Sequence, residues 1–188
     1  MSTSVQRTSR YTTVAIVLHW TIALLIIGLI VFGLLMTQEW VPNRFVIYQW
    51  HKSIGITVLA LSLLRLIWRL THKPPALPTI MPKWQHFASH ATHWLFYGLM
   101  IAMPLLGWAM VSASELPIPT VLFGFIPLPD MPGVPEADAV AGRFQLLHEI
   151  GAKLFIALIV LHIGAALKHH FKDRDDVLRR MAPWVKAK

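Results

Sequence analysis

The histidines that lie inside apolar segments are the residues of this sequence best suited to chemistry. The chain holds ten histidines among 188 residues, yet 55% of its residues are hydrophobic and only 14% are charged. A titratable side chain within an apolar span is costly and commonly marks a functional site, and neutral imidazole is a common metal ligand. No cysteine is present, which excludes disulfides, thiolate metal sites and a cysteine nucleophile.

Four apolar segments are long enough to carry these histidines across a bilayer. The runs 11–38 and 84–114 contain no Asp, Glu, Lys or Arg, and a span needs about 20 apolar residues. Two weaker segments reach that length if their terminal Lys and Arg side chains extend to the interface. We expect an all-α integral membrane four-helix bundle, a single domain over 1–188 with spans at about 14–37, 47–70, 90–112 and 143–170. Two spans with amphipathic surface helices are the alternative.

The distribution of cations predicts the orientation. Lys and Arg gather before the first span, between the second and third, and after the fourth, so the positive-inside rule makes both termini cytoplasmic. The loop at about 115–140 is rich in proline, cannot form a continuous helix, and would face the periplasm. The net charge of +8 could indicate nucleic acid, but the cations flank apolar runs. We therefore expect membrane lipid and no nucleic acid as a partner.

Two pairs of histidines are expected to meet at different depths of this bundle. His148 and His162 are 14 residues apart, which is about 21 Å along a helix and within about 40° of one helix face. His19 shares the cytoplasmic half with His162, and His51 shares the outer half with His148. Haem iron takes axial ligands from opposite sides, so we predict two bis-histidine haem sites, one for each pair.

Small residues support haem over a bare metal ion. Each of the four histidines is followed four positions later by a small residue, namely Ala23, Gly55, Ala152 and Ala166, and residues four apart share a helix face. A zinc or copper site needs three or four donors together. A haem-free metal transporter is therefore the weaker alternative.

Several other charged residues and histidines have more than one interpretation. Lys52 and Lys153 lie beside the outer pair and are predicted to bind haem propionates, although they could also be interfacial cations or steer a small anion. Arg65 and Arg69 could bind the propionates of the inner haem or only anchor the second span. His86, His90 and His93 share one helix face. They could form a third metal site, bind haem propionates, carry protons to a quinone or merely be interfacial polar residues.

Several short sequence motifs, taken in order along the chain, resemble those of a known protein family. These are VLHW (17–20), WHKSIGI (50–56), RLIWRL (65–70), THWLFYGLMIAMPLLGW (92–108), LFGF (122–125), LLHEIGAKLF (146–155) and LHIGAALKHHFKDRDDVLRRM (161–181). The chain resembles the bacterial cytochrome b561 family, which is related to the b-type subunits of hydrogenases and formate dehydrogenases. The resemblance implies a multi-pass protein of the bacterial inner membrane with two b haems on His19, His51, His148 and His162. It also implies ubiquinone near His169, with Arg69 or His170 nearby.

The function expected from this resemblance is transmembrane electron transfer. Electrons would pass between a donor on the periplasmic side, with superoxide as one candidate, and the ubiquinone pool. The chain would then be a superoxide:ubiquinone oxidoreductase or an electron-transfer protein for a periplasmic redox partner. The alternative is a b-type subunit or anchor that serves a separate dehydrogenase.

Overall fold

Four long helices dominate the computed structural model, which describes residues 10–78, 81–116 and 118–186. They are α1 (Thr13–Met36), α2 (Arg44–Thr71), α3 (Lys83–Ala113) and α4 (Asp138–Lys168), which continues into a π-helical turn, η1 (His169–Asp173). Each is long and apolar enough to cross a bilayer, where a helix satisfies its own backbone hydrogen bonds. The prediction of an all-α chain with four apolar helices is confirmed. A short helix, α5 (Val177–Met181), follows η1.

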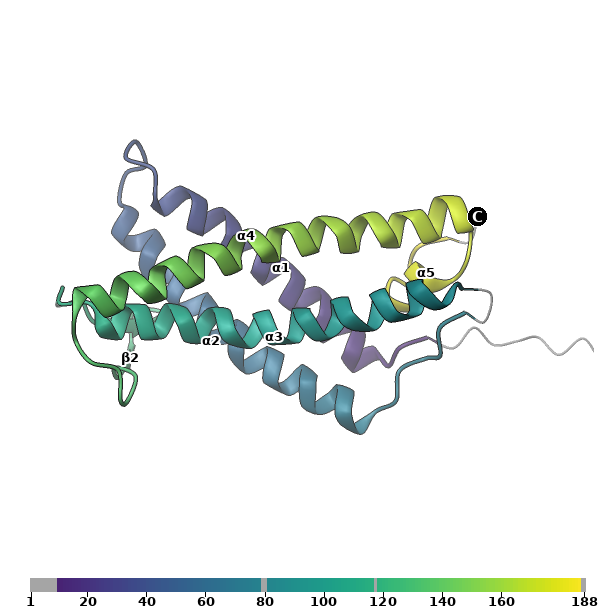
Figure 1. The fold of residues 1–188 in the computed structure, drawn as a ribbon, viewed down its shortest axis with the longest axis horizontal. Helices are drawn as coiled ribbons and strands as arrows, with labels where there is room; N and C mark the ends of the chain where they lie inside the picture. Colours follow the sequence, from purple (N-terminus) through teal and green to yellow (C-terminus); the bar gives the residue numbers. More distant parts are fainter. Residues whose placement is uncertain (1–9, 79–80, 117, 187–188) are drawn as a thin grey trace, which may run out of the picture.

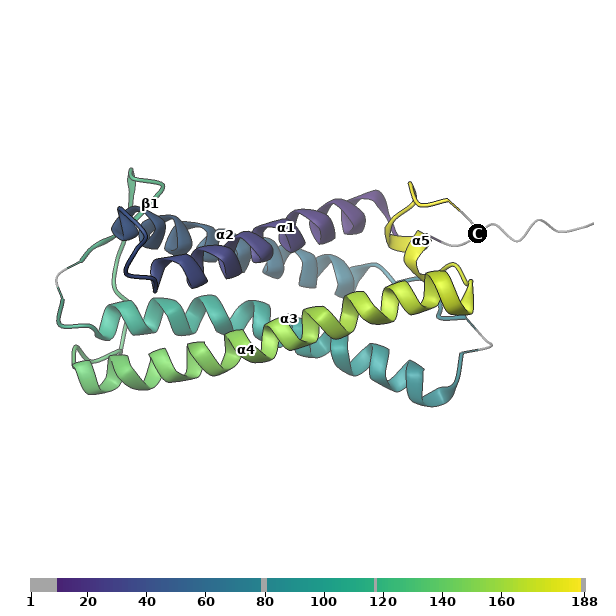
Figure 2. The ribbon, with the colours of Figure 1, turned by 90° about the horizontal axis from the view of Figure 1, so that it is seen from above.

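The helices pack as two antiparallel hairpins that cross each other. The first hairpin, α1 with α2, forms one layer, and the second, α3 with α4, forms the other, with α2 resting on α3 (Figure 2). In Figure 1 the first hairpin runs diagonally across the second. Residues from all four helices form the core between them, including Ile22, Val58, Met100 and Phe155. The opposite faces carry exposed leucine and valine, as expected of surfaces that meet lipid.

Both described ends of the chain lie at the same end of the bundle, which we call the terminal end. The C-terminal segment packs against the start of α1, because the indole Nε1 of Trp20 donates to the Met181 carbonyl at 2.9 Å. The indole of Trp68, near the end of α2, donates to Thr12 Oγ1 at 2.9 Å. Figure 1 shows the connection between α2 and α3 at this end too.

A β-hairpin occupies the opposite end, which we call the hairpin end. The proline-rich connection between α3 and α4 contains two antiparallel strands, β1 (Thr120–Leu122) and β2 (Ile126–Leu128), with Thr120 opposite Leu128. The sequence predicted an irregular loop here, so these strands are an addition to the expected fold. Their turn includes Phe123 and Gly124, with φ angles of 53° and 83°, in the left-handed region that glycine adopts most easily.

Side chains of α2 hold the hairpin against the bundle. The Phe123 amide donates to Ser53 Oγ at 2.9 Å, while the same hydroxyl donates to the Gln49 carbonyl at 2.8 Å. Lys52 Nζ donates to the Pro119 carbonyl at 3.2 Å and to Thr120 Oγ1 at 3.3 Å. The loop therefore lies on the residues that directly follow His51.

The fully buried Ser53 hydroxyl gives a stability prediction. Ser53→Ala should lower the free energy of unfolding by about 0.5–1.5 kcal/mol, because the part-buried Phe123 amide loses its acceptor and a typical intramolecular hydrogen bond contributes about that much. Thermal unfolding of the purified protein in detergent, followed by circular dichroism, measures the loss.

Ser62 provides a matched control on the same helix. It is 0% exposed, against 1% for Ser53, and its hydroxyl has no hydrogen-bond partner among the described residues. Ser62→Ala should therefore cost less than Ser53→Ala. Equal losses would show that the bond to the hairpin contributes nothing.

Candidate functional site

Two histidines from different layers face each other near the hairpin end. His51 lies in the second turn of α2 and His148 in the third turn of α4. Their ring centroids are 6.3 Å apart, and the ring planes are inclined by 67°. The Nδ1 of His148 lies 3.1 Å from the Met103 carbonyl. A ring that donates from Nδ1 to a carbonyl keeps Nε2 as an acceptor, which is the form that binds metal.

A second pair lies nearer the terminal end. His19 of α1 and His162 of α4 have ring centroids 6.3 Å apart and planes inclined by 75°. The buried Nδ1 of His19 has no hydrogen-bond partner within the described part of the chain. The helix positions separate the pairs in depth, because 14 residues of α4 span about 21 Å.

The equal spacing of the two pairs suits one metal ion between each pair of rings. Two imidazoles on opposite sides of an ion, each bonded at about 2 Å, have ring centroids about 6 Å apart. Both pairs have a centroid spacing of 6.3 Å. Each pair also draws its rings from the two different layers, so a flat group could lie between the layers with a ligand on each face.

Glycines on neighbouring helices leave room for the rings of His51 and His148. A β-carbon at Gly33 of α1 would lie 3.4 Å from His51 Cε1, and one at Gly107 of α3 would lie 3.4 Å from His148 Cε1. Such distances are at the tight end of ordinary contacts, so a larger side chain would displace the ring. Sequence reasoning looked for small residues on the ligand helices and missed these two. By contrast, a β-carbon at Gly55 would meet nothing within 4 Å.

A third histidine lies against the pair formed by His19 and His162. The His93 ring of α3 has its centroid 5.6 Å from that of His162, and its Nδ1 lies 2.6 Å from the Ser89 carbonyl. The three histidines of α3 therefore differ. His90 is exposed, whereas His86 Nε2 lies 3.3 Å from the Pro78 carbonyl.

A cavity of about 230 Å³ opens beside His93 at the terminal end. Its lining includes Arg65, Arg69 and Tyr97, and the Arg65 guanidinium lies 5.7 Å from the centre of the Tyr97 ring. Cations and aromatic rings therefore surround it. The lining does not include His169 or His170 among the described residues.

The structure separates the other predicted site residues. Lys52 turns to the hairpin through Pro119 and Thr120, and Lys153 is exposed. His170 is 8% exposed, and its ring lies 4.8 Å from that of Phe171. Arg69, His169 and His170, which were grouped by resemblance, therefore have different surroundings.

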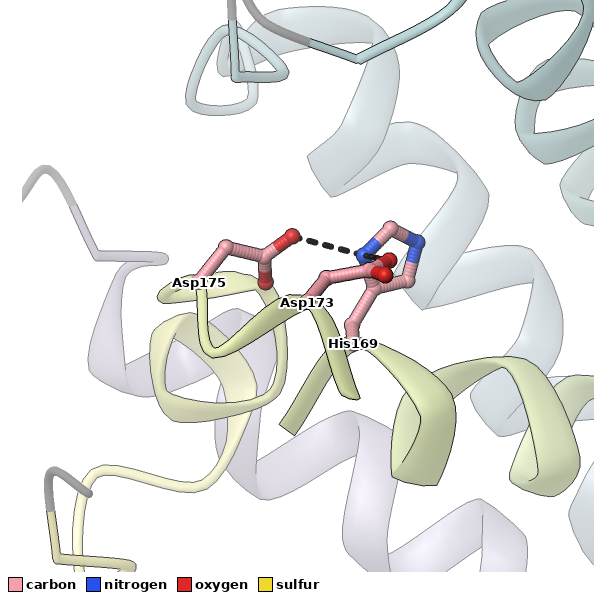
Figure 3. A group of neighbouring side chains, drawn as sticks. All are labelled: His169, Asp173 and Asp175. Atoms are coloured by element: carbon pink, nitrogen blue, oxygen red, sulfur yellow. Dashed lines mark hydrogen bonds and ion pairs between the residues drawn. The ribbon is translucent and has the colours of Figure 1, made fainter. Parts of the chain in front are cut away.

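His169 has acidic partners that the sequence reasoning missed. Its Nδ1 lies 2.6 Å from Asp175 Oδ2 and 3.2 Å from Asp173 Oδ2 (Figure 3). Lys168 Nζ is 2.6 Å from Asp173 Oδ2. The sequence signal was the acidic cluster that begins four residues after His169, but only the π-helical turn brings Asp175 onto the ring.

Comparisons with known proteins extend over almost the entire chain. Residues 10–184 match the family described as prokaryotic cytochrome b561. Cytochrome b561 homolog 2 of Escherichia coli K12 is 33% identical over 178 residues, 92% of this chain and 90% of that protein. Homolog 1 of the same organism is 30% identical over 179 residues, 93% of this chain and 98% of that protein.

A third relative comes from Yersinia pestis and is named probable superoxide oxidase CybB. It is 31% identical over 180 residues, which cover 93% of this chain and 96% of that protein. The resemblance predicted from the sequence is confirmed: this chain belongs to the prokaryotic cytochrome b561 family and is a membrane-embedded b-type cytochrome.

Proposed function

We propose that each histidine pair holds one haem b, with His51 and His148 binding one haem and His19 and His162 the other. The family implies haem b, and the 6.3 Å spacing of both pairs supports these four residues as ligands. Haem b, when bound, supplies a one-electron carrier. Two histidine ligands would leave no position for oxygen on a bound haem, so each site would favour electron transfer over the binding of oxygen.

We propose that the terminal end is cytoplasmic. The terminal end gathers most of the described cations, including Arg65, Arg69, Lys73, Lys168, Lys172, Arg174, Arg179 and Arg180. The connections at the hairpin end carry Glu39, Glu115, Asp130 and Glu136 and few cations. The positive-inside rule then orients both termini to the cytoplasm and the hairpin to the periplasm.

Arg65 and Arg69 are the proposed partners of the inner haem carboxylates. They line the cavity beside His93, and His93 touches the ring of His162. An anion there would offset two guanidinium groups that have no ion-pair partner among the described residues. For the outer haem, we propose the same role for Lys52 and Lys153, although Lys52 would have to share its Nζ with the hairpin.

The function that follows is electron transfer across the membrane, from a donor at the hairpin end to ubiquinone at the terminal end. The observation that carries it is the placement of two histidine pairs at two depths. The name of the Yersinia relative supports superoxide as the donor. A redox protein that docks at the hairpin end is the second candidate.

The ligand assignment predicts which variants share a phenotype. His19→Ala and His162→Ala should each lose the inner haem, while His51→Ala and His148→Ala should each lose the outer haem, because each variant would leave its haem with one protein ligand in place of two. Pyridine haemochrome content gives the number of haems, and a redox titration of the reduced bands identifies which remains. Any other pairing of phenotypes would contradict the assignment.

The close approach of Gly107 to His148 predicts a second way to lose the outer haem. Gly107→Val should displace the His148 ring, because even a β-carbon would lie 3.4 Å from it, and the haem count should fall from two to one. Gly98→Val is the matched control, since Gly98 also lies on α3 but faces open space. Retention of both haems by the Gly107 variant would argue against His148 as a ligand.

The donor is tested with the purified wild-type protein. Superoxide, generated steadily from dissolved oxygen in the presence of ubiquinone-1, should produce reduced quinone in proportion to the protein added. Protein stripped of haem should give none. If the haem-loaded protein gives none, superoxide is not the donor, and a protein partner at the hairpin end becomes the favoured donor.

A further inference from the structure

The imidazole of His169 and the carboxylate of Asp175 form a mostly buried pair at the terminal end. His169 Nδ1 lies 2.6 Å from Asp175 Oδ2, and the two side chains are only 13% and 12% exposed. This distance is that of a strong charge-assisted hydrogen bond. The second carboxylate oxygen, Oδ1, accepts from the Val177 amide at 3.0 Å, so Asp175 also fixes the start of α5.

The backbone is shaped to bring Asp175 onto the ring. The π-helical turn ends at Asp173, and Arg174 adopts a left-handed conformation with φ of 53°. The Asp175 amide then donates to the His169 carbonyl at 3.2 Å. Non-glycine residues rarely adopt positive φ, and π-helical turns are frequent at functional sites. The chain therefore reverses direction here, and Asp175 contacts His169 through both its backbone amide and its side-chain carboxylate.

This contact selects the protonation pattern of the ring. A carboxylate at Nδ1 keeps a proton on that nitrogen. Nε2 is therefore the ring nitrogen that can gain and release a proton. Figure 3 shows the second ring nitrogen pointing away from both carboxylates. His169 lies seven residues after His162, which is two turns and about 10 Å along the helix, on nearly the same face. Nε2 is thus the ring nitrogen that neither carboxylate contacts.

We propose that Asp175 is a positioning residue for quinone reduction, holding His169 so that Nε2 passes a proton to a quinone oxygen. The inference rests on the proposed function. In the balanced step, two superoxide ions are oxidised to two O₂ at the hairpin end, and their two electrons, together with two protons, reduce one quinone to the quinol. When both of its ring nitrogens are protonated, His169 gives the Nε2 proton to one quinone oxygen and is reprotonated from solvent at the terminal end. The second proton also comes from that solvent, so two protons are taken up for each quinol formed.

Asp173 does not share this role. Its Oδ2 lies farther from His169 Nδ1, at 3.2 Å, and carries the ammonium of Lys168 at 2.6 Å. The same contacts disfavour a metal ion among His169, Asp173 and Asp175, although their ligand atoms lie within 4.8 Å of one another. Lys168 and the Val177 amide already occupy one oxygen of each carboxylate.

The test is Asp175→Asn in the haem-loaded protein, with Asp173→Asn as the matched control. Asparagine keeps an oxygen for the Val177 amide but presents an NH₂ group to His169 Nδ1, which reverses the tautomer. Ubiquinone-1 is the probe, and dithionite-reduced spectra report haem content. We expect the maximal rate of quinone reduction to fall at least about tenfold, since general acids contribute 10²-fold or more. The KM for quinone and both haem bands should stay unchanged.

The outcomes separate this inference from the proposed function. A maximal rate near that of the wild type, a raised KM alone, or an equal loss in Asp173→Asn would overturn the role of Asp175. A wild type that does not reduce ubiquinone-1 would overturn the quinone function itself, and the inference with it. If Asp175→Asn loses haem, Asp175→Ser replaces it, since serine still caps the Val177 amide but offers no carboxylate.

Discussion

The meeting of imidazoles from two crossed layers is the constraint on which the arrangement of the bundle depends. α4 contributes one ring to each pair, His148 and His162, while the partners come from α2 and α1 of the other hairpin. One helix must therefore face two different helices at two depths, and the crossing of the hairpins makes this possible (Figure 1). If the hairpins ran parallel, α4 would meet the same neighbour along its entire length.

α3 provides no member of either pair, yet it fixes both rings of α4. At the hairpin end, the Met103 carbonyl and Gly107 bound the ring of His148. At the terminal end, the rings of His93 and Phe96 lie 5.6 and 5.4 Å from that of His162. Residues that orient a ligand matter to a metal site nearly as much as the ligand itself. The close packing of α3 on α4 is therefore part of the site.

The features that could be predicted from the sequence are those that follow from the length and periodicity of its helices. Uncharged apolar runs indicated four helices, and the spacing of 14 residues put His148 and His162 on one face, because both features follow from helix geometry alone. The contacts that escaped prediction depend on tertiary packing or on unusual backbone. Gly33 reaches His51 from another helix, the hairpin needs the distant Ser53, and Asp175 needs a left-handed residue before it.

The two ends of the bundle differ in the chemistry that they can support. At the hairpin end, neutral hydrogen bonds and a lysine hold a proline-rich loop against the part of α2 that follows His51. At the terminal end lies the one group of three neighbouring histidine and carboxylate side chains in the described part of the chain. An electron can enter from superoxide without a proton, whereas reduction of a quinone to a quinol consumes two. Under the proposed function, a proton-handling group is therefore needed only at the end where electrons would leave, and His169 and Asp175 lie at that end.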